Sequence, residues 1–96
     1  MTTILPNGIE IPDPDLWIWL AYDFRCVAHP HIYGVCLHEN PPKSKNPHWR
    51  EQPWTRYCVC AHCHEQIHEM RTLERDAFLD FNRTKNFPDA ERLLCQ

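Results

Sequence analysis

A chain of 96 residues can fold as one small domain, and such a domain buries only about two thirds of the surface that its unfolded chain exposes. The formal net charge is −3 with histidine counted as neutral, which argues against a tight nucleic-acid binder with a basic surface. There is no run of about 18 apolar residues, so we expect no transmembrane helix and no membrane partner.

Six cysteines and seven histidines are available to stabilise this small core. Domains of this size usually need a bound metal or disulfides. Residues 1–10 have neither a basic start nor a long apolar run, so no secretory signal is predicted. We therefore expect a cytoplasmic protein with reduced thiols, held together by Zn²⁺ rather than by disulfides.

The N-terminal quarter predicts an extended arm followed by a helix. Residues 1–12 contain a turn signal at Asn7-Gly8. Asp13-Pro14-Asp15 is typical of a helix start, because aspartate caps helices and proline suits their first turn. Residues 16–24 place apolar side chains at helical spacing, and we expect their two tryptophans to pack in the core.

Two cysteines three residues apart, Cys60 and Cys63, are half of a typical structural zinc site. The other half lies upstream, where Cys26 is followed by both His29 and Cys36. Zinc accepts four thiolates or three thiolates and one imidazole, so the sequence leaves both sets open. We prefer Cys36, because a thiolate binds zinc well and this one follows a glycine turn; His29 is the alternative.

A pair of histidines follows the second cysteine pair. His64 comes directly after Cys63, and His68 comes one helical turn later. Side chains four residues apart lie on the same face of a helix and can share one ion. Two imidazoles leave positions on that ion open, as a catalytic ion requires.

Two short strands and a long loop are predicted before this helix. We expect strands over residues 35–39 and 55–60, paired antiparallel, with Cys58 in the core. Residues 40–53 contain four prolines, which exclude regular structure. Basic and aromatic side chains in and after this loop suit contact with a phosphate backbone. The candidate nucleic-acid contacts are Lys43, Lys45, Arg50 and Arg56.

The C-terminal part predicts three helices. The first opens at Ala61 or His62 and carries the histidine pair. A second covers residues 73–81, and a third covers residues 89–95 with Leu93 and Leu94 packing inward. The fold class is therefore α+β.

This order of features resembles the HNH, or His-Me finger, endonuclease family, and its small phage-type members in particular. The features are a cysteine pair, a strand histidine, a loop, a second strand and a helix that begins with Cys-x-x-Cys-His. The closest match is residues 60–68, which read Cys-Ala-His-Cys-His-Glu-Gln-Ile-His. The resemblance covers about half of the chain. It implies a zinc-stapled domain with a ββα-metal core at residues 25–70, preceded by an arm and Trp-rich helix at 1–24 and followed by a helical extension at 71–96, all in one compact domain.

The resemblance also implies roles for individual residues. His38 matches the general base on the first strand. The family's middle position falls near Thr55 when counted back from Cys60, or at His48 when counted forward from His38, and a second, lower-ranked alignment gives His48 the strand position. His64 and His68 match ligands of the catalytic ion, for which Mg²⁺, Mn²⁺ and Ni²⁺ are the candidates. Leu37 stands where the family usually has a histidine or aspartate ligand.

The resemblance implies a metal-dependent DNA endonuclease or nickase that hydrolyses phosphodiester bonds, and the chemistry of these residues fits that reaction. Because the net charge is negative, we expect a protein partner or a homo-oligomer to deliver it to DNA. The resemblance suggests a phage or prophage protein that acts in the bacterial cytoplasm. The alternative function is a non-catalytic zinc-binding adaptor on the same scaffold, which acts through protein–protein contacts of the Trp-rich helix; Leu37 and the net charge favour it.

Overall fold

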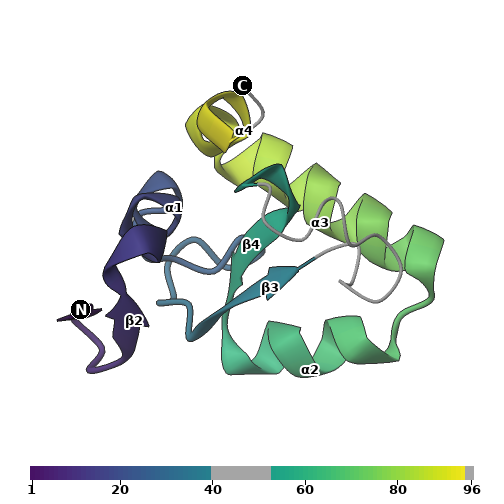
Figure 1. Ribbon diagram of the computed structural model, residues 1–96. Helices are drawn as coiled ribbons and strands as arrows, with labels where there is room; N and C mark the ends of the chain where they lie inside the picture. Colours follow the sequence, from purple (N-terminus) through teal and green to yellow (C-terminus); the bar gives the residue numbers. More distant parts are fainter. Residues whose placement is uncertain (40–52, 95–96) are drawn as a thin grey trace.

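The computed structural model describes residues 1–39 and 53–94. Within these residues the chain forms two small antiparallel sheets, each of two strands, and four α-helices (Figure 1). The predicted α+β class is confirmed at this level.

The N-terminal arm is a hairpin that leads into a short helix. Strand β1 (Thr2–Ile4) pairs with β2 (Glu10–Pro12), and the predicted turn is confirmed, with Gly8 at a φ of +86°. A 3₁₀ turn (Asp13–Asp15) then opens α1 (Leu16–Ala21). This helix is shorter than expected, because Asp23 and Phe24 both adopt left-handed φ angles and reverse the chain.

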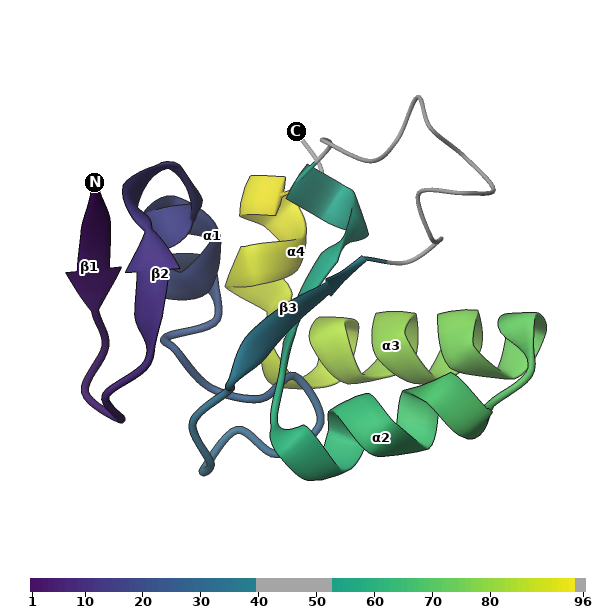
Figure 2. The ribbon, with the colours of Figure 1, turned by 60° about the horizontal axis from the view of Figure 1, so that its bottom comes forward.

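The second sheet leads directly into the helix that carries the histidine pair. Strand β3 (Cys36–Glu39) pairs antiparallel with β4 (Arg56–Val59), with His38 opposite Tyr57. Helix α2 (Ala61–Glu69) begins one residue after Cys60, so β3, β4 and α2 are neighbours in space as well as in order (Figure 2). The predicted strand positions and the helix start at Ala61 are confirmed.

Two further helices complete the molecule. Helix α3 (Thr72–Asn86) is longer than predicted, and α4 (Pro88–Leu94) follows it after the expected break. The two are joined to the second sheet by the buried Arg83, whose Nε lies 2.6 Å from a carboxylate oxygen of Glu91. The same guanidinium donates to the carbonyl of Trp54, in the 3₁₀ turn Pro53–Thr55, at 2.8 Å, and stacks on Tyr57.

A single cluster of buried apolar side chains runs from Leu5 in the N-terminal hairpin to Leu94 in α4. Trp19 is in this core as predicted, whereas Trp17 lies on the outer face of α1 and is 48% exposed. The expectation that Leu93 packs inward was wrong, because the helical turn that buries Leu94 points its neighbour outward.

None of the helices in the part of the chain that the structure describes combines the length and the apolar character needed to cross a bilayer.

The approach to β3 requires a glycine at residue 34. A Cβ atom there would lie 2.2 Å from the Cys58 sulfur and 3.3 Å from the Val59 carbonyl oxygen. We expect Gly34→Ala to lower the free energy of unfolding by about 1–3 kcal/mol, the usual cost of overpacking. The measurement is denaturant unfolding of the zinc-loaded protein.

Removing the sulfur provides the control for this prediction. In a Cys58→Ala background the extra methyl has more room, so adding Gly34→Ala should cost less there than in the wild type. Equal costs in the two backgrounds would show that the clash with the sulfur is not the cause.

Candidate metal centres

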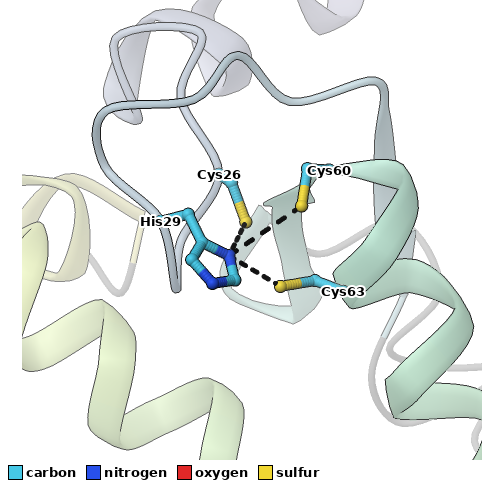
Figure 3. A group of neighbouring side chains, drawn as sticks. All are labelled: Cys26, His29, Cys60 and Cys63. Atoms are coloured by element: carbon cyan, nitrogen blue, oxygen red, sulfur yellow. Dashed lines mark hydrogen bonds between the residues drawn. The ribbon is translucent and has the colours of Figure 1, made fainter.

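The first candidate centre gathers three thiols and one imidazole at the junction of β4 and α2. Cys60 and Cys63 come from the start of α2, and Cys26 and His29 come from the loop before β3. That loop is tight: the Cys26 amide donates to the Ile32 carbonyl at 2.8 Å. The turn therefore places Cys26 and His29 on the same side of the loop, facing the helix (Figure 3).

The four side chains have the spacing of a tetrahedral metal site. The His29 Nδ1 atom lies 3.8 Å from the Cys26 sulfur, 3.9 Å from that of Cys60 and 3.1 Å from that of Cys63. Ordinary zinc–sulfur and zinc–nitrogen bond lengths give a tetrahedral edge of about 3.6 Å between such atoms. This group can therefore hold a metal ion such as zinc.

The electrostatics of the thiols favour a bound cation. Burial raises the pKa of Cys63, and the neighbouring Cys26 raises it further. Against the effect of burial, hydrogen bonds from the Cys63 amide and from neighbouring thiols lower the pKa of Cys60, so within this group the Cys63 thiol is the one that burial and its neighbours keep protonated. A divalent ion offsets the penalty of burial and binds the thiolates themselves.

The structure corrects our preference for Cys36 as the fourth ligand. Among the described residues the group closes with His29, the alternative, and Cys36 lies outside it. Cys36 is the first residue of β3, opposite Val59, so strand pairing fixes its position. Burial and the nearby thiols of Cys60 and Cys26 raise its pKa. It is thus a protonated neighbour of the cluster.

The described cysteines form no disulfide. Cys58 is fully buried, as predicted for a core residue, and burial raises the pKa of its thiol.

The second candidate centre consists of His38, His64 and His68. Their ring centroids are 4.5–5.8 Å apart, and the Nε2 atoms of His64 and His68 are separated by 3.0 Å. The histidine pair thus shares one helix face as predicted, and the strand histidine points at both rings. One nitrogen from each ring lies within 4.8 Å of the others, so these three can also hold a metal ion.

His38 is the buried member of this cluster. It is 7% exposed, and its Nε2 atom is buried with no hydrogen-bond partner among the described residues. The pKa of its imidazole is lowered to about 4, first by burial and then by the positive charges of His64, His68 and Arg75. A neutral imidazole with an unused buried nitrogen is what a metal ligand requires.

The predicted nucleic-acid contacts are only partly described. Lys43, Lys45 and Arg50 lie outside the described residues, as does His48, the second candidate catalytic histidine. Arg56 lies on β4, where its guanidinium is 3.5 Å from the Glu39 carboxylate and is largely buried. Its charge is therefore already balanced within the protein.

Sequence reasoning missed Arg75, the charged residue of α3 that acts on the His38 ring. Nothing in its local sequence marks it, since it lies in an ordinary amphipathic helix. It comes near the histidine cluster because α3 begins soon after α2 ends, so that its guanidinium reaches the Ile67 carbonyl.

No family model, curated protein or solved structure matches this chain. The resemblance to HNH endonucleases therefore depends on the motif residues of the sequence alone.

The fourth ligand of the cysteine site can be identified by substitution. We expect one tightly bound zinc per chain by elemental analysis, kept in Cys36→Ala but weakened at least about tenfold in His29→Ala. With Co²⁺ in the site, wild type and Cys36→Ala should show the same thiolate-to-metal absorption. Loss of zinc in Cys36→Ala and its retention in His29→Ala would reverse the assignment.

The protonation of His38 can be followed directly by NMR. In protein with one equivalent of zinc, we expect its ring to stay neutral down to about pH 5, because its pKa is near 4. An unfolded histidine titrates near 6.5, so the folded state should lose stability as the pH falls between those values. A ring titration midpoint above pH 6 would contradict this prediction.

Proposed function

We propose that this protein is a metal-dependent DNA endonuclease or nickase of the HNH type, with β3, β4 and α2 as its ββα-metal core. The observation that carries the proposal is the meeting of His38, from β3, with His64 and His68, from α2. A strand histidine and a helical histidine pair, far apart in sequence, point at one place.

The ligand set supports a catalytic rather than a structural ion. Three imidazoles leave at least one position open on a divalent ion, and catalytic sites keep such a position for substrate. When bound, Mg²⁺, Mn²⁺ or Ni²⁺ supplies Lewis acidity at a phosphodiester and lowers the pKa of water. The exposed side of His68 gives a large substrate access to the cluster.

We assign His38 to the ion rather than to the attacking water. A general base works best with a pKa near the working pH, and the pKa of His38 is about 4. Its buried nitrogen also lies among the helix histidines rather than in solvent. In this assignment His38 takes over the metal-binding role that Leu37 cannot perform.

The cysteine site serves the histidine site as a structural zinc centre in this proposal. Cys63 and His64 are adjacent in α2, so fixing one fixes the other. An ion held by Cys26, His29, Cys60 and Cys63 ties the loop before β3 to the start of α2. It thereby sets the distance between the strand histidine and the helix histidines.

The rest of the proposal follows from charge. The whole chain has a net charge of −3, and Arg56 is paired to Glu39, so the charge of Arg56 gives little attraction for DNA. We therefore propose that a protein partner or a homo-oligomer delivers this nuclease to DNA. From the family resemblance we further propose that it is a phage or prophage protein that acts in the bacterial cytoplasm.

One observation favours the second candidate function, a non-catalytic zinc-binding adaptor. On α1, Trp17 and Leu20 are 48% and 53% exposed and lie one helical turn apart. Exposed apolar pairs of this kind suit a protein partner. The adaptor function requires only the cysteine site and assigns no role to the histidine cluster.

Plasmid cleavage separates the two functions. We expect purified protein to nick supercoiled plasmid with Mg²⁺, Mn²⁺ or Ni²⁺. His38→Ala and His64→Ala should each slow nicking by about 100-fold or more, as expected when electrostatic stabilisation of the transition state is lost. His62→Ala is the matched control, because His62 is exposed on the same helix and lies outside the cluster.

Zinc content is measured on each variant, so that loss of activity is not confused with loss of the cysteine site. Intact plasmid with wild-type protein under all three ions would reject the nuclease and favour the adaptor. Equal nicking by wild type and His38→Ala would reject the role given to the cluster.

A further inference from the structure

Arg75 is a half-buried residue in the first turns of α3. It lies near the C-terminal end of α2, which carries His68. One of its terminal nitrogens donates to the carbonyl oxygen of Ile67 at 3.5 Å, and Ile67 is the residue before His68. Its Nε atom is buried and has no hydrogen-bond partner in the described part of the chain. A guanidinium carries five donors, so most of this one is unused.

Arg83, eight residues along the same helix, differs from Arg75 in the partners of its guanidinium. Arg83 is buried and is met by Glu91, Asp80 and the Trp54 carbonyl. Arg75 has no ion pair among the described residues, and the one hydrogen bond that its side chain makes to them is at the limit of useful length. Within the part of the chain that the structure describes, the buried Arg83 is thus paired with carboxylates and the half-buried Arg75 is not.

No carboxylate of the described residues forms an ion pair with the Arg75 guanidinium. The charged groups that act on the His38 ring are His64, His68 and Arg75, and no carboxylate is among them. Glu65 and Glu69 of α2 are both exposed. A divalent ion held by three neutral imidazoles would keep its full charge and add to that of the guanidinium. Two uncompensated cations in a partly buried place favour an anionic ligand.

We propose that Arg75 and the three-histidine cluster form one binding site for a tetrahedral oxyanion of the phosphoryl class, in which the ion takes one oxygen and the guanidinium takes others. This proposal deepens the proposed function, and it rests on that function for the ion and for the phosphodiester as natural ligand. The planar guanidinium matches two oxygens of a phosphate, which a lysine would not do equally well.

The competing role for Arg75 is structural, as a cap on the last turn of α2. The contacts argue against it, because the Ile67 carbonyl already accepts a hydrogen bond from the Met70 amide at 3.3 Å. The carbonyl therefore does not depend on Arg75 for a partner.

The test uses inorganic phosphate and dimethyl phosphate as probes, titrated calorimetrically into the full chain loaded with zinc and then with Mn²⁺. We expect Arg75→Gln to weaken binding of both probes about tenfold or more, as loss of a charged hydrogen bond does. Arg75→Lys should recover part of the loss. Arg71→Gln is the matched control, since Arg71 is exposed one turn earlier, and it should bind within about twofold of wild type.

Melting temperature and Mn²⁺ affinity are measured on the same samples. A lower melting temperature in Arg75→Gln with unchanged phosphate binding would show the capping role and overturn the proposal. Failure of the wild type to bind either probe, or equal effects of Arg75→Gln and Arg71→Gln, would overturn it as well.

The oxyanion site and the nuclease can fail separately. Phosphate binding that depends on Arg75 in a protein that nicks no plasmid would keep the oxyanion site and reject the nuclease. Plasmid nicking together with phosphate binding that ignores Arg75 would keep the nuclease and overturn the oxyanion site.

Discussion

Three thiols and an imidazole converge where β4 ends and α2 begins, and the rest of the structure depends on that convergence. A short strand and a helix of nine residues contribute little stability on their own. An ion bound by this group would join Cys60 and Cys63 to the preceding loop and so fix the direction of α2. The direction of α2 in turn decides where its other side chains lie, the histidine pair included.

The two candidate centres are therefore parts of one arrangement. Cys63 and His64 are consecutive, and the helical repeat turns the first toward the loop and the second toward β3. The two sites differ in the chemical softness of their ligand atoms as well as in their position. Thiolates favour zinc, whereas imidazoles accept a wider range of ions. One short helix can thus hold a tightly bound ion beside an exchangeable one.

Local patterns predicted most of the secondary structure and the residues from which both clusters are drawn. The turn at Asn7-Gly8, the strand pair and the start of α2 each have a signal within a few residues. The choice of His29 over Cys36 could not be predicted, because it depends on how the loop from Cys26 folds back. Arg75 was missed for a similar reason: its neighbours come from helix packing, which no short motif encodes. Spacing indicated which residues could bind metal, and tertiary contacts decided which of them meet.

The buried Arg83 makes the C-terminal helices a necessary part of the fold, although they lie outside residues 25–70, the range whose motifs resemble those of HNH endonucleases. Its guanidinium joins α3 and α4 to the turn that leads into β4. A truncated version that ends after α2 would remove this brace. A version without α4 alone would take away Glu91, the nearest carboxylate to the buried guanidinium, and leave it with Asp80 and the Trp54 carbonyl. A minimal domain engineered from this chain must therefore retain both helices or replace Arg83 and its partners together with apolar side chains.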